Sequence, residues 1–80
     1  MKYKIDMEPL ANHYVVAVKE KDTGLLVRTL TTDDNGAEII KLLQMETSVS
    51  DTAKEIAARY NVSPDVVLAD VEKLVALIED

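Results

Sequence analysis

The sequence predicts an α+β fold of the winged helix-turn-helix type, in which a three-stranded antiparallel sheet precedes three helices. Over the first 31 residues, apolar and polar side chains follow a period of two, which is typical of strands. From residue 34 onward the period is about 3.6, which is typical of helices. Eighty residues, 48% of them hydrophobic and 30% charged, are enough for one small core. We therefore expect a single domain over residues 1–80.

The first strand is expected over residues 2–8. Tyr3, Ile5 and Met7 alternate with charged residues, so their apolar side chains share one face of a strand. Pro9 has no amide hydrogen to donate to a ladder and restricts the residue before it. The strand is therefore expected to end near Met7, and the chain to turn directly afterwards.

The second and third strands are expected over residues 13–19 and 24–31. The second is apolar on both faces at residues 14–18, which is typical of a central strand. Asp and Gly in the segment 20–24 supply the turn between the two strands. Short connections then give an antiparallel meander with Leu25–Leu30 at one edge.

The first helix is expected over residues 34–45. It follows a run of cap-forming residues, and Asp33 or Asp34 is the expected N-cap. The run includes Thr31 and Thr32 and marks the switch from strand to helix. The apolar residues of the helix are Ile39, Ile40, Leu42 and Leu43.

The second and third helices are expected over residues 49–60 and 64–78. Ser48 can cap the second helix, and Ser63 followed by Pro64 is a start signal for the third. In the third helix, two stripes run side by side. The inner stripe is Val67, Val71, Leu74 and Ile78, and the second stripe is Val66, Asp70, Lys73 and Leu77. A stripe that mixes apolar and charged residues suits a surface with an intermittent contact.

The charge distribution argues against a nucleic-acid partner. Residues 1–31 carry five basic and four acidic side chains, whereas residues 32–80 carry four basic and eleven acidic ones. The acidic helical half would repel phosphates. Tyr3, Tyr14 and Tyr60 fall on apolar faces and are expected in the core, with their hydroxyl groups at its rim. Because a helix-turn-helix often binds DNA, a winged-helix nucleic-acid-binding or regulatory domain is kept as the alternative to the interpretation developed below.

The residues that catalysis or metal binding would need are scarce. The chain has no Cys and one His, and a lone His13 at the start of a strand is expected to be structural. The segment 33–36 lacks the alternating ligands and the distal Glu of a calcium loop, and the Gly content gives no phosphate-binding loop. We expect no enzyme, no metal and no cofactor. Without Cys, a signal segment or an apolar run of about 18 residues, we expect a cytoplasmic protein with no membrane contact.

Peptide capture is the function class that the pattern favours. The edge segment Leu25–Leu30 can offer main-chain hydrogen bonds, and the second stripe of the last helix can offer side-chain pockets. In the alternative interpretation the edge is only solvated, and Val66 and Leu77 belong to the periphery of the core. Arg28 is the only basic residue of this strand. It can pair with Asp70 or be held for a carboxylate of an incoming peptide.

Several short segments, taken in order, carry a resemblance to a known family. They are Leu30-Thr31, Asp34-Asn35-Gly36-Ala37-Glu38-Ile39, Leu42-Leu43, Thr47-Ser48-Val49, Ile56-Ala57, Tyr60-Asn61-Val62-Ser63-Pro64-Asp65-Val66 and Asp70-Val71. With these segments the chain resembles the coenzyme PQQ synthesis protein D (PqqD-like) family. Members of this family are the peptide-recognition elements of pathways that make ribosomally synthesised, post-translationally modified peptides (RiPPs).

The resemblance implies a non-catalytic peptide chaperone. Such a protein binds the leader segment of a precursor peptide by β-strand addition and presents it to a modifying enzyme, typically a radical S-adenosylmethionine (radical SAM) protein. A small structural subunit that docks on an enzyme without binding a peptide is a third interpretation. We expect a monomer or a weak homodimer. Carried over by position, the peptide-binding residues are Leu25, Leu26, Val27, Arg28, Thr29, Leu30, Val66, Asp70, Lys73, Leu74 and Leu77.

The chain departs from the family pattern in two places. The Gly usually found in the turn after the first helix is absent from residues 44–47, and the Gly-Leu extension of many relatives is absent after Asp80. The first departure leaves the geometry of the turn open. The second is expected to leave the end of the groove more open.

Overall fold

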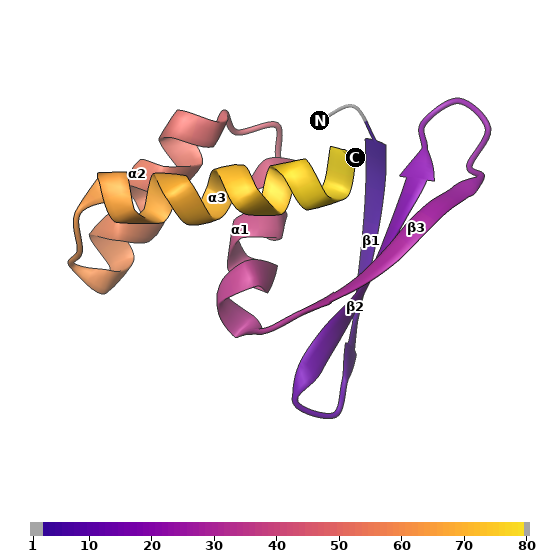
Figure 1. Ribbon diagram of the computed structural model, residues 1–80, viewed down its shortest axis with the longest axis horizontal. Coiled ribbons are helices and arrows are strands. Elements are labelled where there is room, and N and C mark those ends of the chain that lie inside the picture. Colours follow the sequence, from indigo (N-terminus) through magenta and orange to yellow (C-terminus); the bar gives the residue numbers. More distant parts are fainter. Residues whose placement is uncertain (1–2, 80) are drawn as a thin grey trace.

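In the computed structural model, which describes residues 3–79, an antiparallel sheet of three strands is followed by three helices (Figure 1). The strand order is β1-β2-β3, so β2 is central and the other two strands are edges. This α+β architecture confirms the predicted fold class. The elements are β1 (Tyr3–Leu10), β2 (His13–Glu20), β3 (Leu26–Thr32), α1 (Asp34–Gln44), α2 (Val49–Tyr60) and α3 (Pro64–Glu79).

Strand β1 continues beyond the predicted end near Met7, as far as Leu10, and Pro9 lies opposite Tyr14 in its ladder. The prediction of an early end was wrong because Pro9 stands where no ladder hydrogen bond is needed. The side-chain amide of Gln44 donates to the main-chain oxygen of Ile5, so the polar groups of Ile5 point away from β2. The direction of the main-chain N–H and C=O groups alternates from one residue of a strand to the next. The nitrogen of Pro9, four residues after Ile5, therefore also points away from β2, toward the free edge where Pro is tolerated. The predicted start of this strand at residue 2 lies outside the described residues.

Strand β3 begins and ends one to two residues later than predicted. Leu25 lies in the turn, where its carbonyl accepts from the amide of Glu20 at 3.0 Å. Thr31 was the predicted last residue of the strand, but both Thr31 and Thr32 pair with β2, opposite Val15 and Tyr14. Threonine has a high strand propensity, and pairing with a preformed central strand outweighs its use as a cap former. The sheet therefore extends up to the first helix.

A β-bulge interrupts the ladder between β2 and β3. Val18 lies opposite Arg28, whereas the next residue, Lys19, lies opposite Leu26. Val27 is therefore the extra residue on β3. A bulge of this kind adds twist and ends the regular pairing of the strand.

The core consists of two clusters that meet at Leu74 of α3, which packs against both. The sheet cluster contains Ile5, Val16, Val18, Ile40 and Ile78, with Leu30 partly buried against it. The helical cluster contains Ile39, Leu42, Leu43, Ala53, Ile56, Ala57, Val67 and Val71. Because residues of α1 and α3 enter the sheet cluster, these two helices cover one face of the sheet (Figure 1).

The helix boundaries follow local capping chemistry. The carboxylate of Asp33 accepts from the amide of Gly36 at 2.9 Å, and the hydroxyl of Ser48 accepts from the amide of Asp51 at 3.1 Å. The N-cap of α1 is therefore Asp33 rather than Asp34. Helix α2 has its predicted bounds, α1 ends one residue earlier than predicted, and α3 ends one residue later, at Glu79.

The turn after α1 takes its left-handed residue from Glu46, which has φ of +60°. The amide of Glu46 donates to the carbonyl of Leu43 at 3.1 Å, and the amide of Thr47 donates to the carbonyl of Leu42 at 3.3 Å. These two bonds form a Schellman motif, whose left-handed position is usually Gly. Glu46 thus occupies the left-handed position that is usually Gly, so the turn forms without a Gly in residues 44–47.

Tyr60 is not a core residue, although its spacing predicted one. Its side chain is 49% exposed, and its hydroxyl donates to Glu38 at 2.8 Å. Tyr60 is the last residue of α2 and lies beyond the buried residues of that helix. The hydrogen bond to Glu38 raises the pKa of the Tyr60 hydroxyl. Tyr3, Tyr14 and His13 are half-buried.

Candidate functional site

The register of the sheet shows which residues of β3 face its free edge. Ile5 points its main-chain groups away from β2, so its partner Val18 must direct its own groups toward β3. Val18 lies opposite Arg28, whose main-chain groups are therefore used in the ladder. The alternate residues Thr29 and Thr31 point their amide and carbonyl groups outward.

The outward main-chain groups of Thr29 and Thr31 are unpaired. Among residues 3–79, no hydrogen bond outside the sheet ladder uses them, and both residues are exposed. An unpaired edge strand can accept a further strand through its amide and carbonyl groups. β3 therefore offers a docking edge for an extended chain.

The side chains of β3 alternate between two environments. Arg28, Leu30 and Thr32 are half-buried on the side of the helices, whereas Thr29 and Thr31 are exposed on the opposite side. A strand added at this edge would alternate in the same way. Half of its side chains would face the helices, and the other half would face solvent.

A groove of about 300 Å³ lies at the helix side of this edge. It is bounded by the end of β3, the beginning of α1 and the second stripe of α3 together with Leu74. Its apolar wall includes Ile39, Leu74 and Leu77, and Asp70 and Lys73 bring charge to it. The complete lining is Thr32, Asp33, Asn35, Gly36, Ile39, Asp70, Lys73, Leu74 and Leu77. This volume is at the lower end of the range for ligand pockets, so it suits individual side chains of a peptide.

The junction of β3 and α1 is closely packed. A Cβ atom built on Gly36 would lie 1.8 Å from the Oγ1 atom of Thr32 and 3.0 Å from its Cβ atom. Only Gly allows the first turn of α1 to approach the end of β3 so closely. This contact fixes one wall of the groove.

The predicted site residues divide into two sets. Asp70, Lys73, Leu74 and Leu77 line the groove, and Thr29 lies on the free edge. Val66, at the beginning of α3, is 63% exposed and is not part of the groove lining. Leu25, Leu26 and Val27 are exposed around the turn before the regular ladder.

Sequence reasoning missed the residues that the groove takes from the beginning of α1 and the end of β3. They are Thr32, Asp33, Asn35, Gly36 and Ile39, and Thr31 on the free edge was missed as well. Asp33 and Gly36 were interpreted only as turn and cap residues. A glycine in the first turn of a helix was the available signal for a close backbone approach.

Arg28 contacts α3, but through a main-chain oxygen. Its Nη1 atom donates to the carbonyl of Leu77 at 3.2 Å. Of the two alternatives left open for Arg28, the pair with Asp70 is not formed, since none of the ion pairs among residues 3–79 includes Arg28. Helix α3 has no basic residue in its last turn, and a cation placed there is stabilised by the helix dipole. Arg28 supplies that cation from the sheet.

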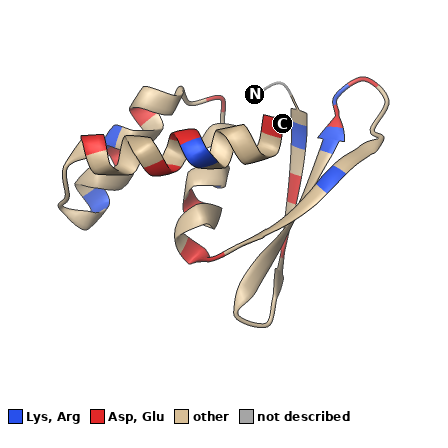
Figure 2. Ribbon diagram, viewed as in Figure 1, with Lys and Arg blue, Asp and Glu red and all other residues tan. Residues whose placement is uncertain are grey.

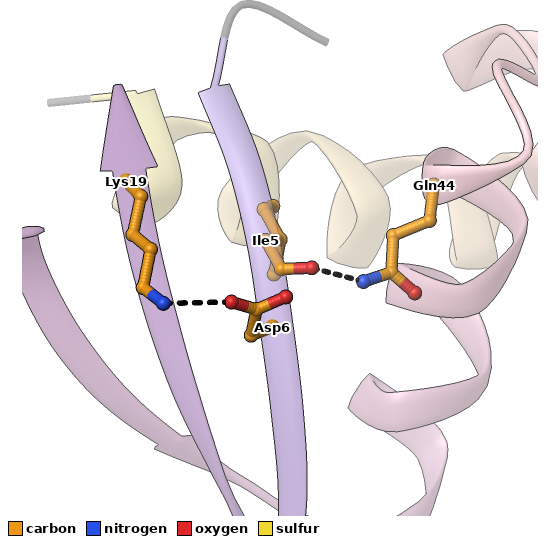
Figure 3. Close-up of polar contacts among 4 residues, drawn as sticks. All are labelled: Ile5, Asp6, Lys19 and Gln44. Atoms are coloured by element: carbon orange, nitrogen blue, oxygen red, sulfur yellow. Dashed lines mark hydrogen bonds and ion pairs between the residues drawn. The ribbon is translucent and has the colours of Figure 1, made fainter. Parts of the chain in front are cut away.

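The opposite edge of the sheet, at β1, is partly covered by α1. The amide of Gln44, at the end of α1, donates to the carbonyl of Ile5 (Figure 3). On the same strand, Asp6 accepts from Lys19 at 2.9 Å. The hydrogen bond and the charge of Lys19 lower the pKa of the Asp6 carboxyl. Two outward positions of β1 are therefore unavailable to a further strand, namely the carbonyl of Ile5 and the nitrogen of Pro9, which carries no hydrogen.

Charge and residue type limit the chemistry of this surface. The helices carry most of the acidic residues, as Figure 2 shows, and Lys73 is the only basic residue in the described part of α3. No group of three or more His, Asp or Glu residues within residues 3–79 could hold a metal ion. In the same part of the chain, no helix combines the length and apolar character that crossing a membrane requires.

The fold and the site define a class of protein, namely small α+β domains in which an open sheet edge lies beside a groove formed by helices. Within this class, the chain belongs to the family described as Coenzyme PQQ synthesis protein D (PqqD), whose profile matches residues 14–80. No curated protein matches the chain.

A solved structure, described as TbiB1 in complex with the TbiA(beta) leader peptide, has a similar fold. The TM-score is 0.67 at 20% sequence identity, and the match covers 96% of this chain and 86% of the other. This likeness supports the fold described above.

Proposed function

We propose that the protein binds the leader segment of a ribosomally made precursor peptide as an added strand on β3. The observation that carries the proposal is the open edge at Thr29 and Thr31 beside the groove of α1 and α3. Membership of the PqqD family and the similar fold of a protein solved with a leader peptide support it. The groove provides a place for side chains of the added strand.

In this proposal, affinity and specificity come from different parts of the site. Main-chain hydrogen bonds to Thr29 and Thr31 hold any extended chain and depend little on its sequence. The alternate side chains that face the helices contact Ile39, Leu74 and Leu77, which favours apolar residues at those positions of the leader. The groove therefore selects which peptide is retained.

The proposed role is non-catalytic. The protein presents the leader to a modifying enzyme, for which the family resemblance suggests a radical SAM protein, in the cytoplasm. We assign no catalytic residue and no cofactor. A nucleic-acid ligand is not part of the proposal, because the exposed face of α3 carries Asp65, Asp70 and Glu72 against Lys73.

The test is a titration of the isotopically labelled protein with synthetic leader peptides from candidate precursors encoded in the same genome. The amide signals of Thr29 and Thr31 should move most, followed by those of Lys73 to Leu77. A scrambled peptide of the same composition is the control. Shifts confined to the exposed face of α3, with β3 unchanged, would rule out strand addition.

A further inference from the structure

Arg28 joins β3 to the last turn of α3 beside the groove. Its guanidinium donates to the carbonyl of Leu77 at 3.2 Å, and the side chain of Leu77 lines the groove while remaining 57% exposed. The carbonyl belongs to the last four of a helix that ends at Glu79, and such carbonyls have no amide donor within the helix. The bond thus satisfies an otherwise unpaired acceptor.

The other contacts between α3 and the sheet act at different points. Ile78 is fully buried in the sheet cluster, and Leu74 and Leu30 pack against it. Apolar packing of this kind holds the helix against the sheet but is non-directional. The hydrogen bond from Arg28 is directional and acts on Leu77 itself. It therefore restricts how far the outward side of α3 can move from β3.

We infer that Arg28 is a positioning residue, which holds the last turn of α3 at a fixed distance from β3 and so sets the width of the groove at Leu77. The inference rests on the proposed function, because it concerns the groove that would receive side chains of the leader. In this role the guanidinium contacts the protein's own main chain. It does not pair with a carboxylate of the leader.

Two substitutions separate the charged head of Arg28 from its aliphatic stem. Arg28→Met keeps an unbranched apolar stem but removes the charge and all donors, whereas Arg28→Lys keeps the charge and one donor group. We expect Arg28→Met to weaken leader binding about tenfold, as the loss of a charge-assisted hydrogen bond predicts. Arg28→Lys should recover most of the affinity. Binding is measured by calorimetry well below the unfolding temperature of each variant, so that a loss of stability alone does not change it.

A double-mutant cycle distinguishes positioning from direct contact. Each Asp or Glu of the leader peptide is replaced in turn by Asn or Gln, and each peptide is measured with the wild-type protein and with Arg28→Met. Positioning by Arg28 predicts that each replacement changes affinity by the same factor in both proteins. A replacement that weakens binding to the wild-type protein but not to Arg28→Met would show an ion pair with the leader and overturn the inference.

Hydrogen exchange supplies a readout of groove geometry without the peptide. In Arg28→Met, the amides of residues 76–79 should exchange faster than in the wild-type protein, while those of α2 should be unchanged. If Arg28→Met does not fold, Arg28→Leu gives the same comparison, because its side chain is also neutral and has no donor. Equal affinity of the wild-type protein and the neutral variant would refute the inference while the proposed function stands. Failure of the wild-type protein to bind any leader peptide would instead refute the proposed function.

Discussion

The two edge strands of the sheet differ in what their outward main-chain groups meet. On β1, the carbonyl of Ile5 already accepts a hydrogen bond from Gln44, and Pro9 has no amide hydrogen to offer. On β3, Thr29 and Thr31 present amide and carbonyl groups without partners in the described chain. A sheet of three strands thus has one edge that favours a fourth strand. Its other edge carries two of the devices that proteins use against unwanted pairing, a proline and a covered carbonyl.

The difference arises from the order of the chain. Helix α1 follows β3 directly and stands beside the sheet, with its beginning at the end of β3 (Figure 1) and its end in contact with β1. Gln44 at the end of the helix can therefore contact Ile5, whereas Gly36 at its beginning packs against Thr32. Helix α1 thus covers part of the β1 edge and also forms one side of the groove at the β3 edge.

Removing a single outward amide from β3 should have the largest effect. Thr29→Pro deletes an edge donor and leaves the ladder to β2 intact, because Pro is tolerated with its nitrogen facing the free edge. We expect leader affinity to fall by at least about tenfold, measured by calorimetry. Thr29→Ala, which keeps the amide, should bind normally.

The corresponding experiment can be applied to the β1 edge. Pro9→Ala adds an outward amide to β1, and we expect leader affinity to stay unchanged. If Pro9→Ala bound a second peptide, or if Thr29→Pro bound as well as Thr29→Ala, the contrast between the two edges would be refuted.

The junction beside the open edge should be sensitive to one methyl group. Gly36→Ala places a Cβ atom against Thr32, and we expect it to destabilise the fold by about 1–3 kcal/mol although Ala favours a helix. The midpoint of urea unfolding measures this change. The double variant Gly36→Ala/Thr32→Ala removes the Oγ1 atom and should recover most of the stability. An equally unstable double variant would contradict this account of the junction.

The contact that covers part of the β1 edge should have a smaller effect. Gln44→Ala removes the donor to Ile5, and we expect a loss of about 1 kcal/mol in the free energy of unfolding. Leader affinity should not change, because the site lies at the other edge. Lys41→Ala, at an exposed position one turn earlier, is the control for helix propensity. A matching loss in both variants would mean that the contact to Ile5 does not contribute.

The smallest effect concerns pH and the ion pair beside the β1 edge. Lys19 lowers the pKa of Asp6 in the folded protein, first through its hydrogen bond and then through its charge. This contribution to stability is therefore present above the ordinary aspartate pKa of 3.8 and is lost as pH falls through the lowered value. Unfolding at neutral and acidic pH should show a slightly smaller pH dependence for Asp6→Asn. An unchanged pH dependence would show that the pair does not contribute to stability.

The sequence predicted most of the secondary structure because its signals are local. Ser48, Pro64 and the periodic apolar residues define the helices to within one residue. The strand ends were harder. Whether Pro9 is tolerated depends on which way its nitrogen points, and this follows from the register with β2. Thr31 and Thr32 are good cap formers as well as good strand residues, and only pairing with β2 decides between these roles.

The candidate site was predicted in part for the same reason. The two stripes of α3 could be read from helical spacing, and four of the site residues predicted on them line the groove. Gly36 and Ile39 could not be assigned to it, because their place beside α3 depends on how α1 packs. The partner of Arg28 could not be predicted either, since a main-chain carbonyl leaves no mark in the amino-acid sequence.

The bulge at Val27 gives the open edge a definite length. Regular pairing with β2 runs only from Arg28 to Thr32, and α1 begins two residues later. In the proposed complex, a leader can follow β3 over this short interval and must leave the strand at both ends. The length of this interval therefore determines how many residues of the precursor are immobilised. The distance from that anchored segment to the residues that are modified then becomes a property of the precursor sequence.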